Sequence, residues 1–316
     1  MPNNTIYAIA VISNPIGYDS RTRLFREFAE RIEGTPGVQL IRVELVSHGK
    51  DFQLTEPNNP FHIQLRSNHV VWYKENMINV AIKRLPLDWK FMAWIDADLT
   101  FLNPDWVEAT RQALQTHKIV QLFDTAEDLG PDEVPMSTVR SFGYMYQKNG
   151  CVAPAIDENS KRGGIWTDGI QWHPGYAWAA TRKTIRGVGG LMDFPIVGSG
   201  DHLMTLAIVD QVERITNINF APGYLRAINE WKNKAIEVID GNLGYVPGTI
   251  RHHYHGSKKN RGYTWRTNII TKTSFDPYTD LRWNLEGVME LVVENPRQEA
   301  LRDSLVNYFI SRKEDE

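Results

Sequence analysis

The sequence predicts an α/β protein with a mostly parallel central sheet, and three observations support this fold class. Short apolar runs of strand length alternate with segments of helical periodicity from residue 5 onward. The first three of these segments follow the order strand, helix, strand, which is typical of a βαβ unit. Of the 316 residues, 42% are hydrophobic and 11% aromatic, enough to bury a large core. A single domain over residues 1–316 is therefore expected.

The first βαβ unit occupies residues 5–46. Residues 5–14 are β-branched and apolar with few polar interruptions, as expected for a strand buried on both faces of a parallel sheet. A helix is expected behind Ser20 as its N-cap, ending at Gly34. Residues 39–46 then alternate as the second strand.

The alternation continues to residue 123. Residues 74–85 carry a helical apolar stripe that ends before Pro86, and residues 91–102 begin as a buried strand that turns acidic. Pro104 opens another helix, and residues 119–123 are typical of a further buried strand.

The second half is less regular. Residues 124–133 contain five acidic side chains and are expected to form a solvated loop without a function. Residues 140–200 are rich in Gly, Trp and Tyr and are expected to form loops over a site. A helix is expected from Asp201, and two amphipathic C-terminal helices over residues 285–294 and after Asn295-Pro296.

Composition excludes several classes of protein. Cys151 is the only cysteine, so a disulfide scaffold is excluded and a reducing compartment is favoured. The N-terminus lacks a basic region followed by a signal-type apolar run, and no segment reaches the length of a membrane span. We therefore expect a soluble, cytoplasmic protein. With 35 basic and 38 acidic residues the formal charge is −3, so a polyanion would have to bind a local basic patch.

Asp96 and Asp98 form the strongest local signal for chemistry. They directly follow the apolar run 91–95, at the edge of a sheet where ligands of α/β proteins collect. Carboxylates in that place are costly to leave unpaired, so a divalent cation or strong donors should meet them. An isolated pair of this kind is more often a solvated turn or a helix cap, but the buried run before it favours a metal.

A second cluster lies around His253 and His255, which share one face if the segment is extended. Imidazole beside carboxylates favours Mn²⁺ over Mg²⁺, although such a pair also serves as a hydrogen-bonded structural feature. No acidic residue occurs between Gly241 and Phe275. The segment 251–272 could clamp a pyrophosphate, follow a nucleic-acid backbone or form a solvated loop, and its cations and interleaved aromatic residues are Arg251, Lys258, Lys259, Arg261, Arg266, Lys272, Tyr263 and Trp265.

A Gly-flanked turn delivers Asp201 to a helix start, where it is either an N-cap or a general base. The aromatic residues before it could stack on sugar rings or bases, or pack in the core; they are Trp172, His173, Tyr176 and Trp178. Motifs of dinucleotide-binding proteins, P-loop NTPases, zincins and serine hydrolases are absent from the sequence.

The order of these elements resembles metal-dependent glycosyltransferases of the GT-A fold, a Rossmann-like nucleotide-sugar-binding domain. The likeness rests on the strand ending at Asn14, the segment WIDADLTF, the turn GSGDH and the later HHYHG. It implies a Mn²⁺ or Mg²⁺ ion held chiefly by Asp98, with Asp96 on ribose or metal, His255 completing the site and His253 in reserve. It also implies Asp201 as the catalytic base of an inverting transfer, with Gly200 standing where an acidic residue is usual.

The same resemblance implies a donor, most simply a UDP-sugar, bound in the half 1–123. The half 124–275 would hold acceptor and metal, and 276–316 would form a helical tail. The donor-binding residues would be Asn14, Arg66, Lys74, Asp96, Lys258 and Arg261.

More narrowly, LRSNHVVWYKENMINVAIKRLP, WKFMAWIDADLTF and RHHYHG followed by RGYTWR are similar to phage and base-J-type enzymes that glycosylate hydroxymethylated bases in DNA. This similarity implies a 5-hydroxymethylpyrimidine acceptor and action in a host cytoplasm. The acceptor side would be formed by Trp172, His173, Tyr176, Trp178 and Trp265. Alternatives are a saccharide acceptor, a sugar nucleotidyltransferase, or a non-catalytic module that binds nucleic acid or sugar.

Overall fold

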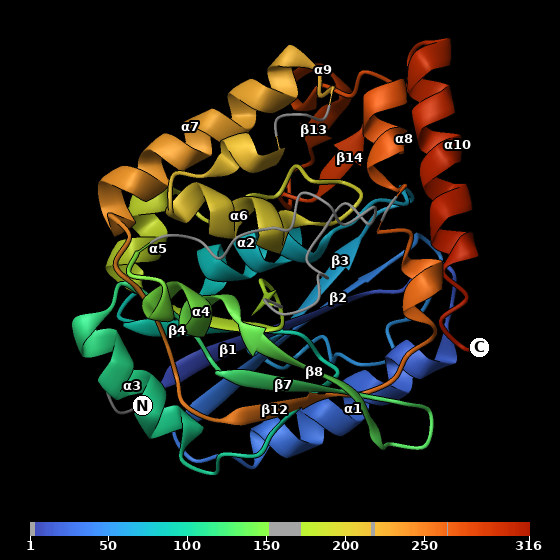
Figure 1. Ribbon diagram of the computed structural model, residues 1–316. Helices are drawn as coiled ribbons and strands as arrows, with labels where there is room; N and C mark the ends of the chain where they lie inside the picture. The colour runs from blue at the N-terminus through green and yellow to red at the C-terminus, as the bar shows by residue number, and fades with distance from the viewer. Residues whose placement is uncertain (1–3, 152–171, 216–218, 264) are drawn as a thin grey trace.

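A seven-stranded sheet forms the centre of the protein in a computed structural model that describes residues 4–151, 172–215, 219–263 and 265–316 (Figure 1). In spatial order its strands are β11 (Leu243–Tyr245), β6 (Ile119–Gln121), β10 (Ala177–Thr181), β4 (Phe91–Ile95), β1 (Ile6–Ser13), β2 (Val38–Val46) and β3 (His62–Arg66). Strands β4, β1, β2 and β3 are parallel, as are β11 and β6, and β10 runs antiparallel between these groups. The predicted α/β class with a mostly parallel sheet is confirmed.

Strand β1 shows why the sheet is covered on both sides. Ile6, Ala8 and Ala10 face one core, and Tyr7 and Ile9 face the other. The first core is covered by α1 (Asp19–Glu33) and α3 (Trp106–Thr116). The second is covered by α2 (Lys74–Arg84), α5 (Arg182–Val188), α6 (Gly200–Ile208) and α7 (Pro222–Ile239), on the opposite side of the sheet in Figure 1.

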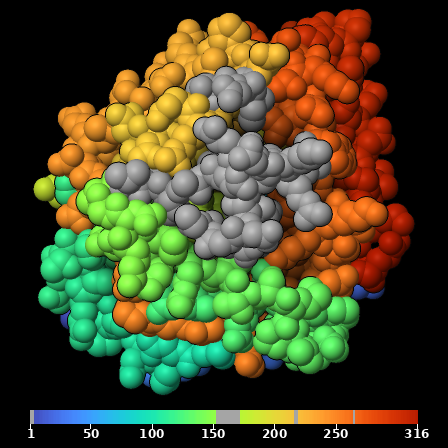
Figure 2. All heavy atoms as spheres, viewed as in Figure 1, coloured from blue at the N-terminus to red at the C-terminus, as the bar shows by residue number. Residues whose placement is uncertain are grey.

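A second sheet of five strands lies beside the first. Its order is β5 (Leu99–Phe101), β12 (Thr249–His252), β7 (Thr125–Leu129), β8 (Pro135–Ser141) and β9 (Trp172–His173). Figure 2 shows atoms of the late segment β12, in orange, between those of the earlier strands on the molecular surface.

The expectation of a solvated acidic loop over residues 124–133 is wrong, because residues 125–129 form β7. Their side chains alternate between half-buried and buried positions, and Asp128 is only 1% exposed. The prediction relied on the number of acidic residues, but successive side chains of a strand point to opposite faces of the sheet whatever the overall charge of the segment.

The C-terminal region contains α8 (Thr267–Lys272), α9 (Pro277–Asp280), β13 (Leu281–Trp283), β14 (Met289–Leu291) and α10 (Pro296–Ser311). The helix after Asn295-Pro296 is confirmed, but the helix expected over residues 285–294 is wrong. That segment instead includes β14, paired antiparallel with β13 through a turn in which Gly287 has a φ of 82°. Met289 and Leu291 are buried around the half-buried Glu290, which is the alternation of a strand.

Helix α1 begins one residue before the expected cap. Ser20 lies inside the helix, and the backbone N–H groups of Asp19 and Ser20 donate to the Asp315 carboxylate at 3.0 and 2.8 Å. A carboxylate distant in sequence therefore supplies the capping acceptor that Ser20 was expected to provide. Gly34 ends the helix as predicted. Helix α4 (Phe142–Lys148) and 3₁₀ turns at Val212–Ile215 and Lys258–Arg261 complete the described elements.

Candidate active site

A pocket of about 200 Å³ opens at the carboxyl ends of β1 and β4. Ser13 lies at the end of β1, and Asp96 and Asp98 follow β4. The first turns of α2 and α6 contribute Lys74 and Asp201. Ligands of open parallel sheets bind at this edge, because the chain leaves the sheet there and exposes loop side chains and helix N-termini.

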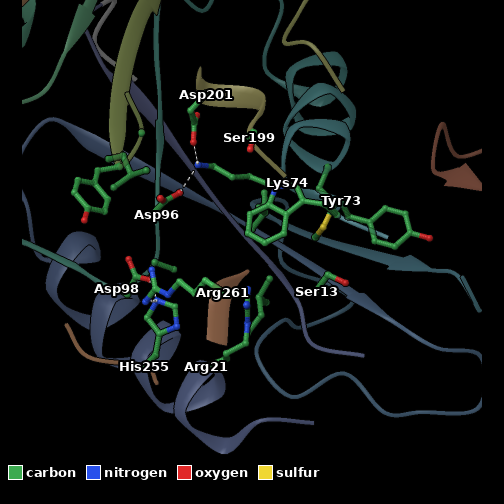
Figure 3. A pocket seen from close by; sticks show the side chains of 18 of the residues that line it. Ser13, Arg21, Tyr73, Lys74, Asp96, Asp98, Ser199, Asp201, His255 and Arg261 are labelled. Atoms are coloured by element: carbon green, nitrogen blue, oxygen red, sulfur yellow. Dashed lines mark hydrogen bonds and ion pairs between the residues drawn. The ribbon is translucent and has the colours of Figure 1, made fainter. Parts of the chain in front are cut away.

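Lys74 joins the two predicted carboxylates on one wall of the pocket. Its Nζ lies 2.6 Å from Asp96 Oδ1 and 3.0 Å from Asp201 Oδ2 (Figure 3). The Asp201 Oδ1 atom is buried without a hydrogen-bond partner among the described residues. One oxygen of Asp201 is therefore held by an ammonium group, and the other remains available as an acceptor.

Burial and repulsion between carboxylates govern protonation on this wall. Burial, with the charges of Asp98 and Asp201, raises the pKa of Asp96 to about 6 against the opposing effect of Lys74. Burial and the charge of Asp201 raise the pKa of the neighbouring Glu75 to about 8. Burial disfavours the Lys74 ammonium, but Asp201 and Asp96 outweigh it and raise the Lys74 pKa well above its usual value. The wall therefore carries one firmly held ammonium group, and Asp96 and Glu75 beside it take up protons more readily than ordinary carboxyl groups.

On the opposite wall, Asp98 meets two histidines. Its Oδ2 lies 3.1 Å from His255 Nε2 and 3.7 Å from His252 Nε2, and one ligand atom from each residue lies within 4.8 Å of the others. Asp98 Oδ1 is buried without a hydrogen-bond partner among the described residues. Burial favours protonation of Asp98, but His252 and His255 outweigh it and hold the Asp98 pKa well below its usual value. This convergence of acceptor atoms suits a divalent cation.

The His252 ring is fixed from behind by Asp128. Asp128 Oδ1 lies 2.9 Å from His252 Nδ1 and accepts from the Tyr176 hydroxyl at 2.6 Å. Its other oxygen accepts from Lys258 Nζ at 2.5 Å and Ser137 Oγ at 2.9 Å. Burial disfavours the charged ring, but Asp98 and Asp128 outweigh it and raise the His252 pKa to about 9. A carboxylate behind a ligand histidine is typical of metal sites, where it fixes the tautomer that presents Nε2 to the ion.

Cationic side chains converge on the same pocket. Besides Lys74, the pocket is lined by Arg21, Arg261, Arg266 and Arg312. Arg261 Nη2 lies 2.9 Å from His255 Nε2, and Arg261 Nε is buried without a described partner. Guanidinium groups beside a metal site are suited to phosphate oxygens, since their planar N–H groups match two oxygens at once.

The structure places about half of the sequence-predicted site residues at the pocket. Those that line it are Lys74, Asp96, Asp98, His173, Tyr176, Asp201, His255 and Arg261.

Several other predicted site residues point elsewhere. Asn14 bonds the backbone of Tyr18, and Arg66 lies over the Phe52 ring while bonding the carbonyls of Ser47 and Lys50. His253 Nε2 lies 2.9 Å from the Thr100 hydroxyl, away from Asp98.

Lys258 lies behind the pocket wall, where its Nζ donates to the Asp128 carboxylate. Trp172 and Trp178 are 2% and 3% exposed and pack against Phe142 and Trp94, as core residues do. Trp265 is 41% exposed and packs edge-on against Tyr308. The expectation of loops over residues 140–200 is wrong for much of the described part, which contains α4, β9, β10 and α5. Residues 152–171 of that region lie outside the described residues.

Sequence reasoning missed His252, Asp128, Arg21 and Glu314. The signal for His252 was present, since it is the last residue of a strand that pairs with β5 next to Asp98. The alternation that selected His253 and His255 assumed an extended chain, but β12 ends at His252 and the following turn brings residues three apart to one side. Asp128 is the register partner of His252 in β7, which only strand pairing reveals.

No family model matches the sequence, and no curated protein matches it. Among solved structures, the chain is similar to the mannosyltransferase PcManGT of Pyrobaculum calidifontis in complex with GDP-Man and Mn²⁺ (15% identity, TM-score 0.43, covering 85% of this chain and 62% of that one). It is also similar to the catalytic domain of Drosophila β1,4-galactosyltransferase 7 with xylobiose (11%, 0.33, 77% and 65%). A third similar structure is 4-diphosphocytidyl-2C-methyl-D-erythritol synthase of Anaerococcus prevotii (11%, 0.34, 78% and 88%).

The chain thus spans less than two thirds of both glycosyltransferase chains. Since all three identities and TM-scores are low, the function proposed below depends on the geometry of the site. Within the described residues, no helix is long and apolar enough to cross a bilayer.

Proposed function

We propose that this protein is a metal-dependent glycosyltransferase that moves a sugar from a nucleoside diphosphate sugar to an acceptor hydroxyl. The observation that carries the proposal is the meeting of the Asp98, His252 and His255 cluster with a pocket lined by one lysine and four arginines. A divalent ion and arginines together are the means by which proteins bind a diphosphate and offset the charge that develops on it.

The chemistry of the donor set fits the implied ion. Among the residues that the structure describes, one buried oxygen of Asp98 has no hydrogen-bond partner, and two imidazoles beside one carboxylate favour Mn²⁺ over Mg²⁺. Asp98, His252 and His255 would hold the ion, which when bound supplies positive charge to the diphosphate oxygens. Asp96 is engaged with Lys74, so in this proposal it helps to position the lysine and contributes less to the metal.

Asp201 is the proposed base. Lys74 holds its Oδ2, which orients the carboxylate, while Oδ1 can accept the proton of the acceptor hydroxyl. As the acceptor oxygen attacks the anomeric carbon, the bond between that carbon and the diphosphate breaks. Arg261, which lies beside the candidate metal site, is placed to offset the negative charge on the departing diphosphate. Attack from the side opposite the leaving group would invert the anomeric configuration.

Titration calorimetry with UDP and GDP, with and without Mn²⁺, tests the donor site. We expect binding that needs the ion and is lost in Asp98→Ala, with Asp105→Ala as a matched control on the exposed surface. Full affinity without metal, or in Asp98→Ala, would contradict the proposal. Product analysis then separates the alternatives: a glycosyltransferase releases a nucleoside diphosphate, a nucleotidyltransferase releases pyrophosphate from a nucleoside triphosphate, and a binding module releases neither.

For the acceptor, we propose two classes to be compared directly. A 5-hydroxymethylpyrimidine in DNA is the acceptor implied by the family resemblance, and Trp265, Lys259 and Lys272 are exposed side chains of the types that contact DNA. Against a long DNA contact, the other four cations of the segment 251–272 already bond protein groups: Arg251, Lys258, Arg261 and Arg266.

A saccharide acceptor needs no such patch. The protein, Mn²⁺ and UDP-sugars should therefore be incubated separately with hydroxymethylated DNA and with saccharides. Mass analysis of nucleosides and glycans decides between them, and transfer to saccharides alone would end the DNA hypothesis.

A further inference from the structure

We propose that Glu314 is a positioning residue for His255, the second imidazole of the candidate metal site. The inference deepens the proposed function and rests on it. It concerns the segment Arg312–Asp315, which follows α10 and returns to the pocket beside α1, as the C-terminal trace does in Figure 1.

Each candidate ligand histidine has a buried carboxylate behind it. Asp128 lies 2.9 Å from Nδ1 of His252, and Glu314 Oε2 lies 3.5 Å from Nδ1 of His255. Both carboxylates are nearly inaccessible, at 1% and 2% exposed. Both histidines thus have Nε2 toward Asp98 and Nδ1 toward a second carboxylate. Only the Asp128 contact is already a hydrogen bond, whereas His255 Nδ1 is buried without a hydrogen-bond partner among the described residues and has Glu314 as its facing carboxylate.

Two contacts act on Nε2 of His255. A guanidinium group only donates hydrogen bonds, so Arg261 Nη2 at 2.9 Å favours a lone pair on Nε2, whereas the Asp98 carboxylate at 3.1 Å favours a proton there. A lone pair on Nε2, which a bound metal ion also requires, places the proton of the neutral ring on Nδ1, where Glu314 is the carboxylate that faces it.

Glu314 is itself held rigidly. Its carboxylate pairs with Arg21 Nη1 at 3.0 Å and with Arg312, and both arginines line the pocket. The backbone N–H of Lys313 donates to the Tyr18 hydroxyl at 3.0 Å. A rigid, charged acceptor is what a ligand histidine requires to keep its ring orientation when Nε2 binds a metal.

The residue after His255 allows the backbone of Glu314 to come close. Gly256 has a φ of 83°, and a Cβ there would lie 2.8 Å from the Cα of Glu314. Only glycine accepts both the left-handed conformation and the close backbone. The residue after the ligand histidine thus leaves room for the segment that carries its carboxylate.

The test compares Glu314→Gln with Asp315→Asn, each made in the full-length chain. Both changes convert a carboxylate to an amide in the same segment, but the hydrogen bonds of Asp315 among the described residues go to the start of α1 and not to His255. Mn²⁺ affinity is measured by electron paramagnetic resonance, and folding by circular dichroism and thermal melting. We expect Glu314→Gln to weaken Mn²⁺ binding by roughly 10- to 100-fold and Asp315→Asn to leave it unchanged.

A double-mutant cycle shows whether Glu314 acts through His255. In a His255→Ala background, Glu314→Gln should have no further effect on Mn²⁺ affinity. An equal loss in that background, or equal losses in Glu314→Gln and Asp315→Asn, would overturn the proposal.

A measurement on the unsubstituted, metal-free protein keeps the inference testable even if Glu314→Gln does not fold. Nitrogen-15 spectra should show His255 protonated on Nδ1, and an Nε2-protonated ring would overturn the assignment. If the unsubstituted protein binds no Mn²⁺, the proposed function fails, while these spectra still report on the Glu314 contact.

Discussion

Replacing Lys74 with Met removes the one ammonium group between Asp96 and Asp201 while keeping much of the side-chain volume. Breaking a fully buried ion pair costs about 3 to 5 kcal/mol, whereas an exposed pair contributes about 0.2 to 1 kcal/mol. The side chains of Lys74, Asp96 and Asp201 are 13%, 27% and 20% exposed. We therefore expect an intermediate loss of about 2 to 4 kcal/mol in the free energy of unfolding near neutral pH.

The loss should depend on pH. Asp96 has a pKa of about 6 with Lys74 present, so without the ammonium its pKa rises further. A carboxyl group that is harder to ionise when folded binds more protons than in the unfolded state, where its pKa is about 3.9. Its contribution to stability is present at low pH and is lost as pH rises toward the folded-state pKa. In the unsubstituted protein the loss that comes from Asp96 ends near pH 6. In the variant Asp96 continues to reduce stability above about pH 6, by up to about 1.4 kcal/mol per pH unit.

Urea unfolding at about pH 5 and about pH 8 measures this difference, with Lys83→Met as the control. Lys83 lies in the same helix, and its side chain is exposed to solvent. Adding Asp201→Asn to Lys74→Met should recover part of the loss, because it removes one of the two carboxylates left unpaired. A loss no larger than that of the control, or one that stays constant between the two pH values, would refute the reasoning.

Three further predictions concern single side chains. His252→Ala should weaken Mn²⁺ binding, measured by calorimetry, by more than the roughly 10- to 100-fold typical of outer-shell changes, whereas His253→Ala should not; equal effects would contradict the ligand set. Gly200→Ala should lower the free energy of unfolding in urea by about 1 to 3 kcal/mol, since the new Cβ would lie 2.6 Å from a buried carboxyl oxygen of α2. In the control Gly34→Ala the nearest atom would lie 3.8 Å away, so the free energy of unfolding should hardly change. Burial lowers the pKa of His202 to about 4, so on acidification the unfolded state takes up a proton before the folded state does. The free energy of unfolding should therefore decrease as the pH falls below about 6.5, by about 2 kcal/mol at pH 5. His202→Gln should reduce this pH dependence, and an unchanged dependence would contradict the prediction.

The sequence alone determined the features that depend on short-range patterns. The apolar runs that became β1, β2 and β4 and the helical stripe of α2 follow from periodicity over a few residues. The same holds for the position of Asp96 and Asp98, since two carboxylates directly after a buried strand must lie at the sheet edge. Gly200 and Asp201 likewise begin a helix as expected, because the glycine-rich turn before them is a local signal.

Only the tertiary structure decided which side chains meet across long stretches of chain. The choice of His252 over His253 follows from where β12 ends, and the partnership of His252 with Asp128 follows from the register of β12 against β7. Glu314 reaches His255 because α10 returns its following segment to the pocket. These contacts join residues 59 to 124 positions apart, for which the spacing of residue types carries no information. Strand pairing and the packing of α10 supply it, because they bring each carboxylate to the far ring nitrogen of a histidine that faces Asp98.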